Sequence, residues 1–243
     1  TIVVAEPESR LTLVEEWAGG WPGAVASGHV QIHVKEGAAV TYVLLQRWSD
    51  ETTHFFVQNA TVEQGGRLTT LVINLGGGIG KGHLATILGG SGAESVTLGL
   101  SRGRGRQQLD LYTLQDHEAP NTQSDLFVAS ALSDQAHTGY RGLIRIAHAA
   151  QKSNAYMTNR NLLLPEGARA DSTPELEILA DDVRCSHASA TGALDQDQMF
   201  YLLSRGLPAP EAERLMIEGF LSQVLARLPD EALRNDLLQR VLA

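Results

Sequence analysis

The stretch Pro174-Glu-Leu-Glu-Ile-Leu-Ala-Asp-Asp-Val-Arg-Cys-Ser-His187 carries the clearest structural pattern of the chain. Apolar and polar residues alternate on both sides of the Asp181-Asp182 pair, which predicts a strand, an acidic turn and a second strand. Successive side chains of a strand point to opposite faces of its sheet. Val183, Cys185 and His187 are therefore expected on one face of the second strand.

Cys185 and His187 place a thiol and an imidazole about 6.6 Å apart along that strand. They fit three interpretations, as two ligands for iron or zinc, as a nucleophile with its base, or as a buried thiol beside a hydrogen-bonded histidine. Cys185 is the only cysteine of the chain. A self-contained zinc or iron–sulfur site with the usual number of thiolates is therefore excluded.

The sequence before this stretch is typical of short strands separated by glycine-rich and polar turns. Strands of four to seven residues are predicted at His29–Val34, Val40–Gln46, Leu68–Asn74, Ser95–Leu100, Gln108–Leu114, Leu143–Ala147, Ala155–Asn159 and Leu176–Ala180. So many strands before any helical pattern indicate a sandwich or barrel or a β-solenoid. The low aromatic content of 5% favours the narrow core of a solenoid, although no fixed repeat is visible.

The pattern becomes helical after residue 194. Asp195 is the expected N-cap of a helix over Gln196–Arg205, which Gly206 ends. Further helices are predicted at Glu211–Leu228 and Asp230–Leu242. The first of these carries an apolar stripe made of Ala212, Leu215, Met216, Phe220, Val224 and Leu225. We predict a β-domain over residues 1–193 and a helical domain over residues 194–243, which either packs back on the β-domain or docks a partner.

Composition limits the function. The 243-residue chain has a net charge of −9, which argues against a general nucleic-acid partner. A single cysteine suits a reducing compartment, so a cytoplasmic location is expected, and no apolar run is long enough to cross a membrane. The chain opens at Thr1 without Met, so we expect that a preceding region has been removed.

Other motifs carry less chemistry. Leu75-Gly-Gly-Gly-Ile-Gly-Lys-Gly82 departs from a phosphate loop at both ends and is interpreted as a turn between strands. Arg102, Arg104 and Arg106 are expected in an exposed turn. His29 and His33 are expected on a solvated strand face, and His117 in a turn.

Over residues 117–220 the chain closely resembles the SufB/SufD family of the SUF iron–sulfur cluster assembly machinery. The resemblance rests on the opening stretch and on Ala190-Thr191, Phe200-Tyr-Leu202, Ser204-Arg-Gly206, Gly142-Leu-Ile-Arg-Ile146 and Asn161-Leu-Leu-Leu164. The Cys-Ser-His form of the motif is most similar to the SufD branch. The chain also lacks the upstream cysteines expected of a SufB scaffold.

The resemblance implies a mainly β fold, a right-handed parallel β-helix core followed by a small C-terminal helical domain. It implies a non-catalytic subunit that pairs with a SufB-like chain and docks a SufC-like ABC ATPase, and the end of the β-helix could also self-pair into a homodimer when the partner is absent. His187, with Cys185 beside it, would help to hold a transient iron–sulfur cluster or iron that the partner completes, with no cofactor bound stably by this chain alone. The ATPase-docking residues would be Phe200, Tyr201, Arg205, Leu215, Met216 and Phe220.

Two alternatives stay open at this point. A β-solenoid enzyme, such as a polysaccharide lyase or an acyltransferase, would place its acids, bases or histidines along one exposed groove. A purely structural β-helix module would use its edges for assembly, with Cys185 and His187 only packed.

Overall fold

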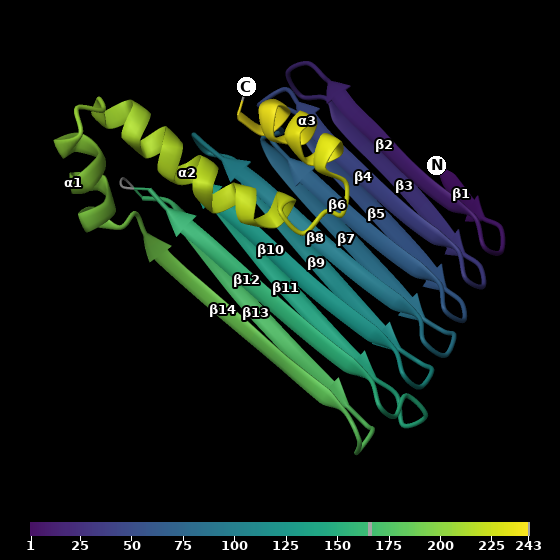
Figure 1. The fold of residues 1–243 in the computed structure, drawn as a ribbon. Coiled ribbons are helices and arrows are strands. Elements are labelled where there is room, and N and C mark those ends of the chain that lie inside the picture. Colours follow the sequence, from purple (N-terminus) through teal and green to yellow (C-terminus); the bar gives the residue numbers. More distant parts are fainter. Residues whose placement is uncertain (165–166, 243) are drawn as a thin grey trace.

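The computed structural model describes residues 1–164 and 167–242 and is built mainly from β-strands (Figure 1). The strands are β1 (Ile2–Ala5), β2 (Arg10–Gly19), β3 (Val25–Val34), β4 (Ala39–Trp48), β5 (Thr53–Val62), β6 (Arg67–Asn74), β7 (Ile79–Leu88), β8 (Glu94–Gly103), β9 (Gln108–His117), β10 (Gln123–Leu132), β11 (His137–Ile146), β12 (Asn154–Leu163), β13 (Arg169–Ile178) and β14 (Arg184–Ala193). The helices are α1 (Gln196–Ser204), α2 (Ala209–Leu225) and α3 (Glu231–Leu242).

The strands alternate between two sheets. Odd-numbered strands form one seven-stranded sheet in the order β1-β3-β5-β7-β9-β11-β13, and even-numbered strands form the other. Each strand pairs in parallel with the strand two places further along the chain, as β10 does with β12 and β11 with β13. The chain therefore winds through a parallel β-solenoid with two strands per turn, which confirms the predicted fold class.

The solenoid turns differ in length, which explains why the sequence shows no fixed repeat. Thr53 pairs with Ile79, 26 positions along the chain, whereas His137 pairs with Arg169, 32 positions along. The predicted strand length of four to seven residues is wrong, since strands such as β4 and β8 contain ten. Polar residues and glycines at the strand ends still join the backbone ladder, so the ladder extends past the apolar pattern that marked each strand.

Tight corners connect the odd-numbered strands to the even-numbered ones. One residue of the corner takes a left-handed backbone conformation, with φ of 64° at Gly37, 61° at Gly65 and 61° at Lys152. Glycine adopts this conformation without steric cost. The glycine and polar turns of the sequence are therefore the corners of successive solenoid turns.

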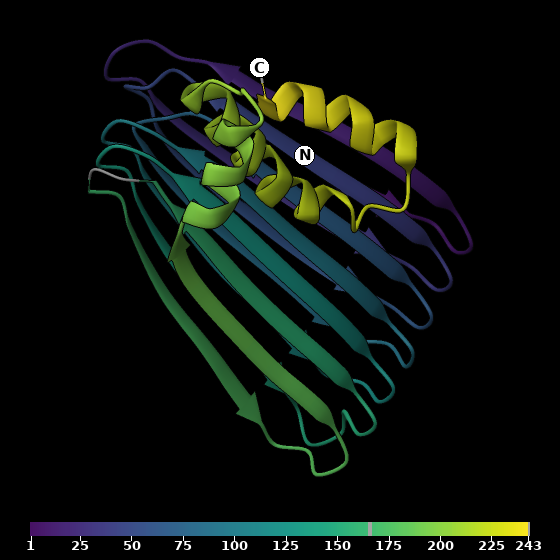
Figure 2. The same ribbon diagram turned by 60° about the vertical axis from the view of Figure 1, so that its left-hand side comes forward.

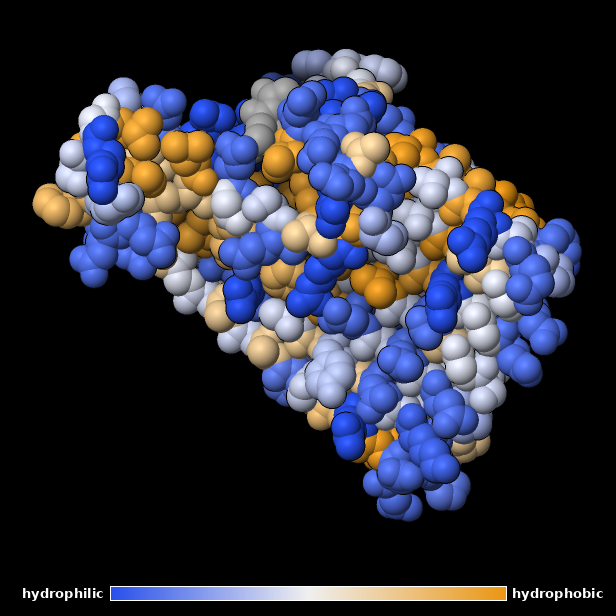
Figure 3. Space-filling view, in the orientation of Figure 1, coloured by the Kyte–Doolittle hydropathy of each residue, from blue (hydrophilic) through white to orange (hydrophobic). Residues whose placement is uncertain are grey.

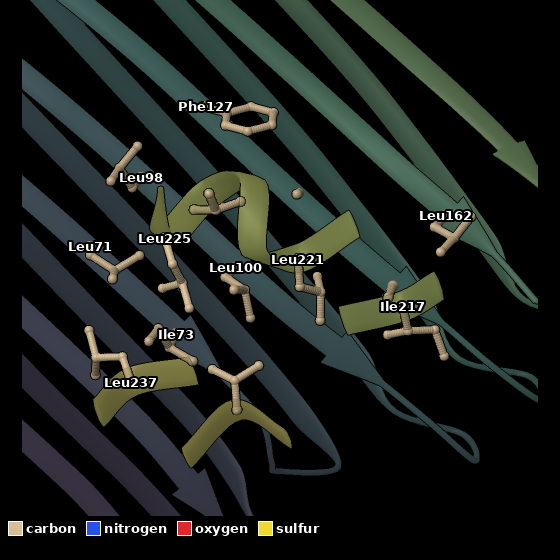
Figure 4. Packing of buried hydrophobic residues seen from close by; sticks show 14 of the residues in the cluster. Leu71, Ile73, Leu98, Leu100, Phe127, Leu162, Ile217, Leu221, Leu225 and Leu237 are labelled. Carbon is tan, nitrogen blue, oxygen red and sulfur yellow. The ribbon is translucent and has the colours of Figure 1, made fainter. Parts of the chain in front are cut away.

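Helices α2 and α3 cover part of the outer face of the even-numbered sheet (Figure 2). Ile217, Leu221, Leu225 and Leu237 pack against strand residues such as Leu71, Ile73, Leu98 and Leu100 (Figure 4). The central even-numbered strands, such as β4 and β10, are thus buried on both faces. On β4, Val43 and Leu45 point toward the helices and Leu44 into the interior. Of the two expectations for the helical segment, packing back on the β-structure is confirmed for α2 and α3.

The predicted helix boundaries are close to the observed ones. The side chain of Asp195 accepts hydrogen bonds from the N–H groups of Asp197 and Gln198, so it caps α1 as predicted. The apolar stripe on α2 is partly wrong, since its buried residues include Ile217 and Leu221 while Leu215 is exposed. The division into domains at residues 193 and 194 stays a prediction.

Candidate functional site

The solenoid ends at strands β13 and β14, each of which has a neighbour on one side only. An edge strand presents unpaired backbone N–H and C=O groups that can pair with another chain. Residues of β14 are exposed almost throughout, in contrast to the buried strands inside the solenoid. This end of the molecule therefore offers two free strand edges side by side.

Cys185 and His187 lie on the inward face of β14. Cys185 is in register with buried Ala155 of β12, and His187 is in register with buried Met157. Val183 and Cys185 also pack against the last part of the interior core. The prediction that Val183, Cys185 and His187 share one face is confirmed.

The two side chains differ in their surroundings. Cys185 is half-buried, and this burial raises the pKa of its thiol, so the neutral thiol is favoured over the thiolate. His187 is exposed. Among the described residues no group of three or more histidine, cysteine, aspartate or glutamate side chains could hold a metal ion. Cys185 and His187 thus form an incomplete set of donors at an open edge.

Side-chain hydrogen bonds join β14 to β13 and to β12. The Ser189 hydroxyl of β14 donates to the Ser172 hydroxyl of β13 at 2.9 Å, across the interior. The Asn161 amide of β12 donates to the Thr191 hydroxyl of β14 at 3.2 Å. These contacts fix β14 in place although no strand covers its outer edge.

Exposed apolar side chains surround the same end. Leu176 is 36% exposed, Ile178 40% and Leu179 54%. Ile178 is in register with Ile146, which is fully buried one turn below. Sequence reasoning did not single out these residues, since their alternation is that of any half-buried strand and only the position of β13 at the end leaves them uncovered.

The predicted ATPase-docking residues lie on α1 and α2. Phe200 is 72% exposed and Tyr201 55%, and the Arg205 guanidinium stacks 5.1 Å from the centre of the Tyr201 ring. Helix α1 has no buried residue and projects beyond the sheet (Figure 1).

A groove of about 430 Å³ runs between α1 and α2. Leu215, Met216 and Phe220 line it together with Leu202. Met216 and Phe220 also pack on the core with part of their surface. The space-filling view shows apolar residues gathered over α1 and the start of α2 (Figure 3). Five of the six predicted residues therefore lie on one pair of neighbouring helices, and Arg205 follows directly after α1.

The remaining histidines join no group of side chains that could hold a metal ion within the described ranges. His29 and His33 lie on the outer face of β3 and contact Asn59 and Thr61. The prediction of a turn position for His117 is wrong. It is the last residue of β9 and fully buried.

Burial lowers the pKa of His117 to about 4. The same cause lowers the pKa of His54 to about 4. Both imidazoles are therefore neutral at physiological pH, and both are enclosed by the solenoid rather than presented to a ligand at its surface.

None of the described helices is long and apolar enough to span a membrane. The Asp181-Asp182 pair lies exposed in the connection between β13 and β14, as the predicted acidic turn requires.

Comparison with known proteins relates these features to one family. A family model described as "SUF system FeS cluster assembly, SufBD core domain" matches residues 1–220. A SufBD family protein of Mycobacterium tuberculosis H37Rv is 33% identical over 223 residues, 88% of this chain and 56% of the relative. The iron–sulfur cluster assembly protein SufD of Bacillus subtilis is 32% identical over 242 residues, 98% of this chain and 55% of the relative.

The SufD protein of Escherichia coli is 30% identical over 210 residues, 86% of this chain and 50% of the relative. The chain thus spans about half the length of the curated relatives it matches.

Proposed function

Because the chain belongs to the SufBD core family of the SUF iron–sulfur cluster assembly system, we propose that it acts as a non-catalytic subunit of the assembly complex. It pairs with a SufB-like chain through the β13–β14 end and docks a SufC-like ABC ATPase through α1 and α2. The observation that carries the proposal is the open solenoid end, where an incomplete donor pair lies among exposed apolar side chains. The complex would work in the cytoplasm.

Exposed apolar side chains and unpaired strand edges at the β13–β14 end support the proposed pairing surface. Leu176, Ile178 and Leu179 are at least 36% exposed, and removing such apolar surface from water stabilises an interface by about 25 cal/mol per Å². The free edges of β13 and β14 can add strands of a second solenoid by main-chain hydrogen bonding. A single partner chain can cover these apolar side chains and pair with the free strand edges at the same time.

The cluster is the cargo of this site. A thiol and an imidazole are donors that iron accepts, and His187 is the exposed member of the pair. The SufB-like partner would supply thiolates from its own side of the interface. Cluster assembly would therefore need the complex, and neither chain alone would hold a complete donor set.

The proposed ATPase-docking helices follow directly after β14, the strand that carries Cys185 and His187. Strand β14 ends at Ala193 and α1 begins at Gln196, so only Leu194 and Asp195 separate them. Leu194 is buried and Asp195 caps the helix, which makes this connection short and ordered. Closure of the ATPase would move α1 and act on the C-terminal end of β14, whose N-terminal half carries Cys185 and His187.

A pair of substitutions tests the two surfaces separately in a co-expressed three-component complex. Leu179→Asp should abolish co-purification of the SufB-like chain and leave ATPase capture intact, because it places a charge in the solenoid-end interface. Tyr201→Ala should do the reverse. Val25→Asp is the matched control, since Val25 is 73% exposed on β3 away from both surfaces. Unchanged pull-down with both variants would refute the proposed surfaces.

A further inference from the structure

The glycine-rich segment after β6 is part of the solenoid ladder. The Gly77 N–H donates to the Trp48 carbonyl at 3.2 Å, and the Gly78 N–H donates to the Thr52 carbonyl at 2.9 Å. Amides that a phosphate loop would direct at its ligand are therefore already used. Any anion site in this region must rely on side chains.

Such side chains meet directly beside Leu75. A pocket of about 340 Å³ lies where α3 covers the C-terminal ends of the even-numbered strands, and four arginines line it with Trp48. They come from three strands or turns and one helix, Arg47 of β4, Arg102 of β8, Arg104 of the following turn and Arg240 of α3. Among the described residues that line it, none carries a carboxylate side chain.

Carboxylates instead hold three of the arginines from outside the pocket. Glu16 accepts hydrogen bonds from Arg47 at 2.9 Å and from Arg240 at 3.2 Å, and so joins β4 to α3. Asp236 also pairs with Arg240, at 2.9 Å. Asp50 lies 4.0 Å from Arg104. Within the described part of the chain, no ion pair joins Arg102 to a carboxylate. A guanidinium can bind one acceptor with one edge and present its other donors elsewhere.

We propose that this pocket binds a small phosphate-bearing anion. Four guanidinium groups line this space. Arg102, which pairs with no carboxylate among the described residues, and Arg104, which lies 4.0 Å from Asp50, offer the planar, paired donors that match phosphate oxygens. The volume lies at the lower end of the range for small-molecule sites, so it suits a diphosphate or a phosphate ester. The four arginines outnumber their carboxylate partners Glu16, Asp50 and Asp236, so the region keeps a positive charge, in contrast to the net charge of −9 of the whole chain. The proposal is independent of the pairing and docking surfaces proposed above.

Isothermal titration calorimetry of the purified chain tests this at constant ionic strength, with sodium pyrophosphate and ADP as the two probes. Saturable binding of either probe is expected, and Arg102→Gln should weaken it roughly tenfold, the usual loss for one charge-assisted contact. Arg104→Gln should weaken binding as well, and it lies in an exposed turn where folding is not at risk. Thermal unfolding of each variant confirms that the fold is intact.

Arg106→Gln is the matched control, because Arg106 belongs to the same turn but points to Gln135 and does not line the pocket. It should bind as the unaltered chain does. Equal affinity for both probes would identify the phosphates as the recognised group, and tighter binding of ADP would identify a nucleotide. Absence of binding at ~1 mM, an affinity of only ~4 kcal/mol, or equal weakening by Arg106→Gln would overturn the proposal.

Discussion

In the solenoid turns directly before and after it, the position equivalent to His117 holds an aliphatic side chain. Register aligns it with Leu88 on β7 and with Ile146 on β11, both fully buried. Its two ring nitrogens contact the hydroxyls of Thr122 at 2.7 Å and Ser124 at 2.9 Å. The imidazole is therefore a neutral, hydrogen-bonded core residue.

This environment predicts loss of stability in mild acid. Burial lowers the pKa of His117 from 6.5 to about 4, so the unfolded chain binds a proton more readily than the folded one. The stabilisation is fully present above pH 6.5 and is lost as the pH falls toward 4, by at most about 1.4 kcal/mol per pH unit. His54 adds a similar dependence, since its pKa is also lowered to about 4.

Urea unfolding between pH 7.5 and 4.5 measures this slope. His117→Leu should make it clearly shallower, whatever the variant does to absolute stability, because one proton-linked group is gone. His29→Leu, a change of an exposed histidine, should keep the original slope. An identical slope in His117→Leu would show that His117 does not titrate with folding.

The sequence could not predict this role of His117. A lone histidine carries no pattern that reveals which hydroxyls it will meet, and its network continues from Thr122 to Ser153, 31 positions along the chain. The placement of Cys185 and His187 was predictable, since it depends only on the alternation of side chains along one strand.

At the scale of elements, α2 stabilises the solenoid through one buried face. Leu221 is fully buried between the helix and the even-numbered sheet. Leu221→Ala should lower the free energy of unfolding by about 2–5 kcal/mol, the usual effect of removing a fully buried leucine side chain. Chemical denaturation measures this change in the free energy of unfolding.

Leu203→Ala is the matched control, because Leu203 is 41% exposed on α1. It should change stability by less than ~1 kcal/mol. Equal effects of the two substitutions would contradict the packing of α2 described above.

Helix α2 also contains a glycine that the fold does not require. No atom lies within 4 Å of the position that a Cβ of Gly219 would take. Gly219→Ala should therefore stabilise the protein by about 0.5–1 kcal/mol, since glycine costs backbone entropy in a helix. A fall in melting temperature would instead show that the helix needs flexibility at this point.

Helix positions were predictable from the sequence, but the buried face of α2 was only partly so. Val224 of the predicted stripe is buried against the sheet, and so are Ile217 and Leu221, which lie outside the stripe. Leu215 of the stripe is exposed. When a helix carries apolar residues on two faces, its sequence does not show which face packs against the sheet. Here the second face forms the groove beside α1.

At the scale of the whole molecule, strand density left a sandwich or barrel and a solenoid open, and the low aromatic content favoured the solenoid. The family resemblance implied the β-helix, while unequal turns concealed its period. The open end could not be predicted from pattern alone, because exposure of Ile178 depends on β13 being the last strand rather than on its residue type. That end carries the proposed cluster donors, and the helices proposed to dock the ATPase follow the same final strand.

The central claim is that His187 is a partner-completed ligand for the nascent cluster. The decisive measurement is the ultraviolet–visible spectrum and iron content of the co-expressed complex carrying His187→Ala, beside one carrying His29→Ala. The account predicts an intact complex that has lost most of its cluster absorbance and iron in His187→Ala, with both retained in His29→Ala. Full cluster content in an intact His187→Ala complex would contradict it.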